Sequence, residues 1–430
     1  MSEWKERILG DIGFTYTGLS GKTIKDFGSG KPYIPYMNIF TNSRIDTTYF
    51  EYVDISPNEK QNRVKEGDLF FTTSSETVEE VGMTSVLIQD VGECYLNSFC
   101  FGFRLFNFDE LLPEFAAYLF RGEDVRKNIS LFGRGSTRYN LPKTELLNRL
   151  KLKLPPLPTQ RKIARILSTS DAVIETTQAA IAKYKAIKQG MLHDLFTRGI
   201  DPASNKLRPA YEDAPELYKE SKLGWIPKEW DVERLGDDRF FDLKTGGTPS
   251  TTKSEYWNGN INWMSSGEVN KKRINDVDGR ITELGMQNSN AVFFPIHSIV
   301  IGLAGQGKTR GTVAIIYIET TSNQSVAAVV FNKEFTNPFF YYHLLDYEYE
   351  RLRSVSAGSG RAGLSLSILG QYDVIMPKLN EQNVISDTLE SIDQKILTEQ
   401  TYLHKLQQIK AGVMADLLSG KKRVAEDKNN

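Results

Sequence analysis

The chain has 430 residues, of which 40% are hydrophobic and 25% charged, which is typical of a globular protein with two or more domains. Its formal charge is −1, from 53 basic and 54 acidic residues, so bulk charge gives no sign of nucleic-acid binding and any such surface must be local. The apolar runs are strand-length, the first residues do not form a signal peptide, and the two cysteines, Cys94 and Cys100, are too few for a disulfide framework or a structural zinc site. We expect a cytoplasmic protein without membrane contact, and we interpret both cysteines as buried.

Residues 1–153 predict a mixed α+β globule. Short runs of β-branched and aromatic residues, bounded by glycine, asparagine or proline, predict strands at 68–72 and 85–88. A Pro-x-Phe-x-x-Tyr pattern at 113–118 predicts a short amphipathic helix. The segment Phe27-Gly-Ser-Gly30 favours a turn over a loop that holds S-adenosylmethionine.

Residues 154–199 predict one long helix. Apolar residues recur there at alternating steps of four and three, which is the pattern of a coiled-coil seam, and prolines precede it while Gly199 ends it. Such a helix is about 60 Å long. Lys188 is polar within the seam and either reaches the surface or fixes the helix register. Gly190 costs about 1 kcal/mol in a helix interior, which indicates close approach of a partner.

The second half repeats this order. Residues 200–229 are polar, charged and contain four prolines, which is typical of a linker between domains. Residues 230–376 predict a second mixed globule, residues 377–420 a second long helix, and residues 421–430 a charged tail. Within the second globule we expect three strands and a short helix, at 299–301, 313–318, 326–331 and 337–342.

The two long helices are copies of one another at a constant offset of 222 residues (382 − 160), without gaps, over about 40 residues. Identical pairs include Gln160/Gln382, Asp171/Asp393, Lys188/Lys410, Gly190/Gly412 and Leu195/Leu417. Further upstream, Trp4 matches Trp230 and the likeness is weaker. The sequence therefore predicts an α+β fold of two globules, each followed by a long helix, with the helices pairing as an antiparallel coiled coil with pseudo-two-fold symmetry.

This layout favours a protein that reads DNA at two places. Globules at opposite ends of a helix pair about 60 Å long would be separated by one turn of DNA or more, since one turn is about 34 Å. Because the globules differ greatly in sequence whereas the helices are similar, we expect two different half-sites.

The chain resembles, over nearly its whole length, the specificity subunits of type I restriction-modification systems. The resemblance rests on Leu-Pro-Pro-Leu-Pro-Thr-Gln-Arg-Lys-Ile-Ala at 154–164, its weaker copy at 376–382, the segment 221–230 and the loop Gly-Ser-Thr-Arg138. In the copy, Lys378 replaces the second proline. The resemblance implies that each globule is a target recognition domain and that the helices form a spacer that docks two methyltransferase subunits. It also implies an endonuclease and translocase subunit as a further partner, with S-adenosylmethionine, ATP and Mg on the partners and no cofactor on this chain.

Polar residues in predicted loops are the candidates for contact with double-stranded DNA, where arginine or lysine pairs with guanine and glutamine with adenine. They are Arg134, Arg138, Lys271, Lys272, Arg273, Gln306, Lys308, Arg310 and Arg361. A loop cap or a solvated turn is the alternative for each. Candidates for docking the partner subunits are the repeated helix positions Gln160, Lys188, Gly190, Gln382, Lys410 and Gly412.

Other motifs have simpler explanations than chemistry. Residues 302–309 match the Walker A pattern, but the β-branched run that follows predicts a strand, whereas a phosphate-binding loop opens a helix. Asn337-Pro-Phe-Phe340 lacks the second proline of the amino-methyltransferase motif and reads as a helix start. The four histidines have no metal or nucleophile spacing.

We therefore predict a non-catalytic subunit, without a catalytic, cofactor or metal site. It recognises an asymmetric bipartite DNA site and directs methyltransferase and endonuclease subunits to it. Two alternatives stay open: a specificity subunit of a type II-like system, and a self-contained DNA methyltransferase.

Overall fold

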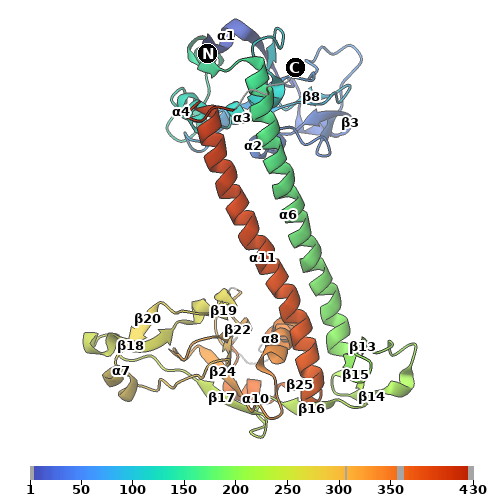
Figure 1. Cartoon of the computed structure of the whole chain (residues 1–430), viewed down its shortest axis with the longest axis vertical. Helices are drawn as coiled ribbons and strands as arrows, with labels where there is room; N and C mark the ends of the chain where they lie inside the picture. Colours follow the sequence, from blue (N-terminus) through green and yellow to red (C-terminus); the bar gives the residue numbers. More distant parts are fainter. Residues whose placement is uncertain (1–3, 306–307, 356–362, 425–430) are drawn as a thin grey trace. The chain divides into compact units, whose positions relative to one another are not determined.

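The computed structural model describes residues 4–305, 308–355 and 363–424 (Figure 1). The chain forms two compact units. Unit 1 comprises residues 1–179 and 401–430, and unit 2 comprises residues 180–400. Each unit thus combines one globule with part of each long helix, so the units cut across the predicted boundaries between globule, helix and linker.

Unit 1 contains two main sheets. Four antiparallel strands in the order β2-β9-β5-β7 form the first, and three strands in the order β4-β3-β8 form the second, in which β3 and β8 are parallel. The strands are β1 (Lys5–Ile8), β2 (Gly13–Thr17), β3 (Phe27–Ile34), β4 (Glu51–Val53), β5 (Leu69–Thr72), β6 (Ser74–Ser75), β7 (Thr84–Val86), β8 (Tyr95–Leu96), β9 (Cys100–Leu105), β10 (Tyr139–Asn140) and β11 (Lys151–Leu154). The helices of this globule are α1 (Leu9–Ile12), α2 (Tyr36–Thr41), α3 (Pro113–Leu119), α4 (Glu123–Ser130) and α5 (Lys143–Arg149).

Unit 2 repeats this topology. Its larger sheet has the order β17-β24-β21-β22 with β19 added at the edge, and its smaller sheet has the order β20-β18-β23, again with one parallel pair. The strands are β16 (Asp231–Arg234), β17 (Phe241–Thr245), β18 (Trp257–Met264), β19 (Arg273–Ile274), β20 (Gly279–Ile281), β21 (Ile299–Gly302), β22 (Val313–Ile316), β23 (Thr321–Ser322), β24 (Val326–Phe331) and β25 (Asp373–Met376). The helices are α7 (Glu283–Gln287), α8 (Pro338–Tyr347), α9 (Tyr349–Ser354) and α10 (Leu366–Gly370). The two globules therefore share a fold that their sequences barely reveal.

The long helices are α6 (Leu157–Thr197) and α11 (Leu379–Leu418). Every position of the predicted apolar stripe is buried or half-buried on both helices. In unit 1 the end of α11 lies beside the start of α6 (Figure 1), and Leu417 belongs to the same core cluster as Ile163 and Leu167. In unit 2, Leu195 of α6 shares a core cluster with Leu389 of α11. Where the long helices adjoin each globule, their apolar stripes are therefore part of its core.

The segment 200–229 is more than a linker. It forms the hairpins β12 (Ile200–Asp201) with β13 (Lys206–Leu207) and β14 (Tyr218–Ser221) with β15 (Gly224–Pro227). Arg208 is buried and pairs with the buried carboxylate of Glu381 on α11, to which Trp230 Nε1 also donates a hydrogen bond of 3.0 Å. Because a buried carboxylate is costly without such partners, this cluster holds the segment firmly within unit 2.

The segment that begins at Phe27 is also different from the prediction. Instead of a turn it is the first part of β3, where the register with β4 shifts between Phe27 and Lys31. Gly30 has φ of 102°, and a Cβ there would lie 2.5 Å from the carbonyl oxygen of Val53, so only glycine fits this irregular strand. β18 has a register shift at the equivalent place, between Trp257 and Ile261.

Among the described residues, no helix carries an apolar stretch that could cross a bilayer. Both cysteines are buried in one core cluster with Ile39 of α2, which confirms the interpretation of the sequence. Burial raises the pKa of Cys94 to about 12 and raises that of Cys100 further.

We predict that neither cysteine of the folded chain reacts with iodoacetamide at pH 8, because the reactive thiolate is disfavoured and the sulfurs are inaccessible. Mass spectrometry of peptides after timed labelling measures this. The chain unfolded in guanidinium should label at both sites within the same time. Rapid labelling of the folded chain at either site would contradict this packing.

Candidate nucleic-acid interface

An open cavity of about 600 Å³ on unit 1 carries the groups suited to contact with nucleic acid. Its walls come from α2, β6 and the segment that ends at Arg138, and the residues lining it are Tyr36, Met37, Phe40, Ser74, Ser75, Glu76, Glu80, Phe99, Thr137 and Arg138. The rings of Tyr36 and Phe40 are stacked with centroids 5.8 Å apart, and Phe99 is 59% exposed. Aromatic rings that line an open cavity can stack on bases, and the neighbouring arginine and hydroxyl groups can hydrogen-bond to base edges.

Two arginines that follow α3 in the chain donate hydrogen bonds to the backbone of the segments beside the cavity. The guanidinium of Arg121 donates hydrogen bonds to the carbonyl oxygens of Ile39, Phe40 and Asn42 at the end of α2, at 2.7, 3.0 and 2.7 Å. Arg126 donates to the carbonyl oxygens of residues 79, 81 and 82 in the same way. Burial lowers the pKa of both arginines to about 10, so both stay charged at neutral pH. The carbonyl groups that end α2 are thereby satisfied and the aromatic wall is fixed.

Of the two predicted contact residues of unit 1, Arg138 lines this cavity and Arg134 does not. Arg138 is exposed, and its Nε donates to Ser74 Oγ at 3.1 Å, which places the guanidinium at the cavity rim. Arg134 is exposed nearby in the chain and forms a two-pronged pair with Glu145 at 3.0 Å. Arg138 thus keeps most of its donors for a ligand, whereas Arg134 has a carboxylate partner already.

The predicted basic cluster of unit 2 is not a basic surface. Lys271 pairs with Glu268 and Asp278, and Lys272 pairs with Asp346 at 2.6 Å. Arg273 is half-buried, and its guanidinium pairs with the carboxylates of Glu390 and Asp393 on α11. Neighbouring acids therefore neutralise all three charges, and the structure gives Arg273 an internal role that corrects its interpretation as a surface residue.

Of the other predicted residues of unit 2, Lys308 and Arg310 lie on the connection between β21 and β22. Lys308 is exposed and Arg310 is half-buried, while Gln306 and Arg361 lie outside the described residues. The strand β22 follows this connection, so the Walker A match does not open a helix and the segment is a strand connection, as predicted.

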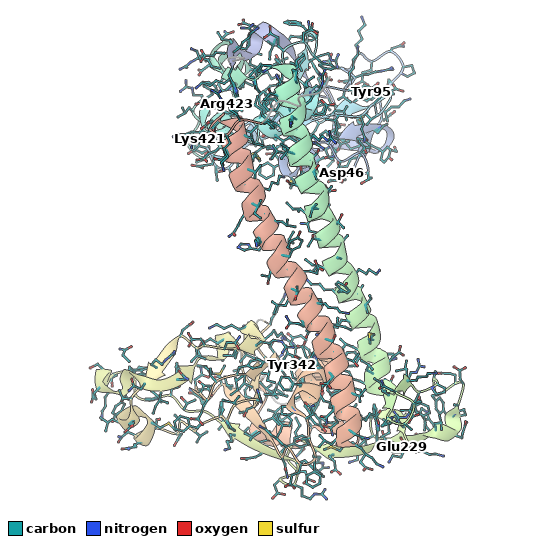
Figure 2. All side chains as sticks on the ribbon, in the orientation of Figure 1. Asp46, Tyr95, Glu229, Tyr342, Lys421 and Arg423 are labelled. Atoms are coloured by element: carbon teal, nitrogen blue, oxygen red, sulfur yellow. The ribbon has the colours of Figure 1, made fainter. Side chains whose placement is uncertain are left out.

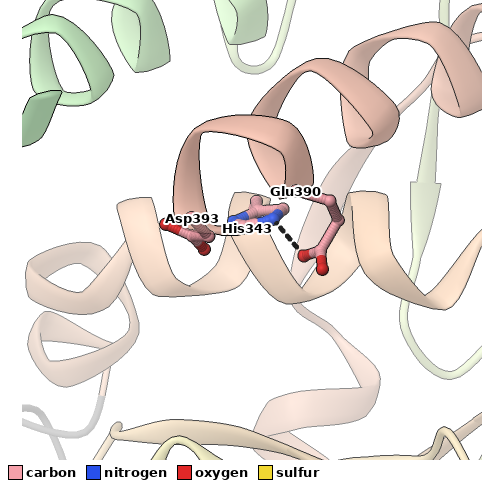
Figure 3. Close-up of side chains that lie close together, drawn as sticks. All are labelled: His343, Glu390 and Asp393. Atoms are coloured by element: carbon pink, nitrogen blue, oxygen red, sulfur yellow. Dashed lines mark hydrogen bonds and ion pairs between the residues drawn. The ribbon is translucent and has the colours of Figure 1, made fainter. Parts of the chain in front are cut away.

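His343 of α8 and Glu390 and Asp393 of α11 bring ligand atoms within 4.8 Å of one another, which resembles a metal site (Figure 3). The two carboxylates already have cationic partners: Arg273 lies 2.7 Å from Glu390 and 3.0 Å from Asp393, and Lys188 lies 2.6 Å from Asp393. Burial lowers the pKa of His343, whose Nε2 lies 2.7 Å from Glu390 Oε1. Burial opposes ionisation of Glu390, but hydrogen bonds from His343 and Arg273 outweigh it and lower its pKa to about 2. We interpret the group as an ion-pair cluster.

The predicted docking residues divide into three kinds. Gln160 and Gln382 are fully buried and use their amides within the chain. Lys188 and Lys410 are half-buried in ion pairs with Asp393 and Asp171. Gly190 and Gly412 are exposed, and a Cβ added to either would meet open space. Of these positions, the glycines are the ones that leave the helix surface open to a partner.

The comparison with known proteins gives a consistent result. The family model described as "Type I restriction modification DNA specificity domain" matches residues 1–185 and 227–410, which is most of the chain and covers both globules. The chain belongs to this family. The two matched ranges correspond to the two copies found in the sequence.

Two relatives match over nearly the whole chain, and a solved structure shares its fold. A putative type I restriction enzyme MjaX specificity subunit of Methanocaldococcus jannaschii is 26% identical over 98% of this chain and 94% of its own. The type I restriction enzyme HindI specificity subunit of Haemophilus influenzae is 21% identical over 98% of this chain and 100% of its own. The S subunit of a type I restriction-modification system from M. genitalium shares the fold with a TM-score of 0.57 at 16% identity, covering 96% of both chains.

Several residues that build this specificity-family protein escaped the prediction. Arg44, Arg121 and Arg126 have no distinctive local pattern, and their partners are distant in the chain. The aromatic side chains of the cavity escaped it too, since they come from α2 and from the residue before β9. The sequence did contain a sign of Asp171 and Asp393. They form one identical pair of the repeat, and their charge is opposite to that of another identical pair, Lys188 and Lys410.

We predict that Arg121→Met opens the cavity wall. Each buried carbonyl left unsatisfied costs about 1–3 kcal/mol, and about 1.4 kcal/mol changes an opening equilibrium tenfold, so Cys94 and Cys100 should label about tenfold faster or more. Ile39, which carries one of the freed carbonyls, packs in the same cluster as both cysteines. Arg149→Met is the matched control, because that side chain is 62% exposed and its loss should leave labelling unchanged. Equal labelling of the two variants would refute the role of Arg121.

Proposed function

We propose that this chain is the DNA-reading subunit of a type I restriction-modification complex and that it recognises an asymmetric bipartite site. Each globule reads one half-site. The repeated topology is the single observation that carries the proposal: both units have the sheet order β2-β9-β5-β7 or its equivalent β17-β24-β21-β22, whereas their exposed side chains differ. One scaffold with two different surfaces suits two unlike DNA half-sites.

The proposal includes an antiparallel pairing of the long helices. Two ion pairs support it, Asp171 with Lys410 and Lys188 with Asp393. Between the first pair and the second, the residue number rises by 17 on α6 and falls by 17 on α11. Neighbouring helices with such pairs run in opposite directions, and a strict repeat gives them a pseudo-two-fold axis.

Two methyltransferase subunits are the partners that we assign to the helices. The open surface around Gly190 and Gly412 supports this, since the two positions are equivalent and would serve two copies of one partner. An endonuclease and translocase subunit would join to restrict. S-adenosylmethionine, ATP and Mg would then reside on the partners, and the chain would contribute binding without catalytic residues.

The near-neutral charge shapes the binding behaviour that we expect. Phosphate contacts supply much of the affinity of DNA-binding proteins, and here many basic side chains pair with acids of the same unit. The isolated chain is therefore expected to bind DNA weakly, with the partners supplying much of the non-specific grip.

Two alternatives have direct tests. A type II-like system would encode no separate translocase beside this chain, so the neighbouring reading frames distinguish it. A self-contained methyltransferase would transfer label from S-adenosylmethionine to DNA without a partner. Incubation of the purified chain with both should give no transfer, and transfer would refute the non-catalytic proposal.

We predict that DNA from cells expressing the chain with its partners is methylated at a motif of two different half-sites separated by a fixed gap. Exchange of residues 1–153 for those of another family member should change one half-site and leave the other unchanged, because each globule folds around its own core. Sequencing that detects methylated bases measures both results. A continuous palindromic motif would contradict the two-globule proposal.

We predict that Arg138→Ala impairs reading by unit 1. Loss of one base or phosphate contact costs about 1–3 kcal/mol, so methylation of the target should fall by about fivefold or more, or one base of that half-site should become tolerated. The other half-site should stay strict. Arg149→Ala, an exposed arginine of the same globule that does not line the cavity, is the control. Identical motifs and rates for the two variants would exclude a DNA contact at Arg138.

A further inference from the structure

A carboxylate in unit 1 joins the globule to both long helices. Asp171 of α6 accepts a hydrogen bond of 2.6 Å from the Tyr118 hydroxyl at Oδ2, while its Oδ1 pairs with Lys410 of α11. Arg44 donates to the same hydroxyl at 2.7 Å and its guanidinium lies over the ring of Tyr118. We call Arg44, Tyr118, Asp171 and Lys410 the Asp171 cluster.

Unit 2 has a carboxylate that likewise contacts its globule with one oxygen and the other long helix with the second. Asp393 of α11 receives Arg273 at Oδ2, at 3.0 Å, and Lys188 of α6 at Oδ1, at 2.6 Å. The guanidinium of Arg273 lies over the ring of Tyr342, which comes from α8 where that helix meets α11 (Figure 2). We call Arg273, Tyr342, Asp393 and Lys188, together with Glu390 and His343, the Asp393 cluster.

The two clusters are equivalent, although only their residues on the long helices match at the constant offset of the repeat. Asp171/Asp393 and Lys188/Lys410 follow the offset of 222 residues. The arginines have no matching sequence context, yet Arg44 and Arg273 stand at the same place in the fold. Each forms a parallel bridge to the equivalent strand, Arg44 to Val86 of β7 and Arg273 to Ile315 of β22. The same four groups therefore meet in both units.

The geometry of the carboxylate explains what such a cluster can do. Each aspartate lies on one long helix. One of its carboxylate oxygens bonds to the globule, and the other pairs with a lysine of the other long helix. Both oxygens are satisfied only in one mutual arrangement of the three. Half-buried ion pairs contribute little net stability, but they are directional and penalise other arrangements. The clusters are thus better suited to setting an angle than to holding the fold together.

We propose that Asp171 and Asp393 are positioning residues that fix the angle of each globule on the long helices, and so determine the gap between the two half-sites. This inference rests on the proposed function. We place the base contacts elsewhere on each globule, so loss of a cluster should leave the half-site sequences intact and broaden the gap that the protein accepts.

We expect loss of the aspartate to affect the gap unequally in the two clusters. In unit 2, Glu390 pairs with Arg273 through two hydrogen bonds and with His343, so the arginine keeps a helix partner without Asp393. The position equivalent to Glu390 in unit 1 is Ser168, which offers no charge. Loss of Asp171 should therefore broaden the gap more than loss of Asp393.

The test uses the full chain with its partners in cells, and methylated-base sequencing of sites with every gap length. With Asp171→Asn or Lys410→Met, methylation at gaps one base pair longer or shorter should rise about fivefold or more relative to the preferred gap, since coupling within such networks is about 0.5–3 kcal/mol. Lys183→Met and Lys405→Met are the controls, because both lysines are exposed, are equivalent in the repeat and lie five residues before Lys188 and Lys410. They should keep the wild-type gap.

The exchange Asp171→Lys with Lys410→Asp separates register from folding. Restoring opposite charges across the helices should narrow the gap distribution compared with either single charge reversal. A variant that is merely less stable would lose methylation equally at all gaps, and that result would overturn the inference. So would an unchanged gap distribution in Asp171→Asn, Lys410→Met and Asp393→Asn. A wild-type motif that is not bipartite would instead refute the proposed function.

Discussion

A buried glutamine sets the first turn of each long helix against the globule. Gln160 accepts a hydrogen bond from the Leu112 amide at 3.0 Å and donates to the carbonyl oxygens of Glu110 and Pro155. Gln382 makes the same three contacts with the amide of Asn337 and the carbonyl oxygens of Phe335 and Pro377. Because a buried amide is costly unless satisfied, this arrangement fixes both where the helix begins and how it is rotated.

The rotation decides the positions farther along. Asp171 and Asp393 each lie 11 residues after the glutamine, which is about three helical turns, so they face the same side as the helix start. That side is the globule. The apolar stripe lies on an adjoining face and includes Lys188 and Lys410, each of which pairs with the aspartate of the other long helix. The glutamine thus sets the rotation of the helix, this rotation orients the aspartate, and the aspartate pairs with the lysine of the other helix.

Ion pairs within the chain occupy many of the basic residues that enter its near-zero net charge. Lys271, Lys272 and Arg273 form the densest basic run of the second globule, yet acids of unit 2 hold each of them. Arg121 and Arg126 likewise use their donors on backbone carbonyls. These basic residues build the scaffold, whereas exposed ones such as Arg138 and Lys308 stay candidates for recognition. Under the proposed function, affinity for DNA would depend on the partners and selectivity on this chain.

The sequence by itself determined the elements whose pattern is local. The long helices, the apolar stripe, the short helices α3 and α8 and the strands β21 and β24 follow from which residues must face a core, and that requirement repeats every few positions. Tertiary structure alone decided what meets across the chain. Asp171 and Lys410 are 239 residues apart, and Arg208 and Glu381 are 173 apart, so no local period connects them. Pairing of charged side chains depends on the path of the backbone between them. For this reason the sequence pattern predicted a linker at 200–229, which is folded, and a surface position for Arg273, which pairs with α11.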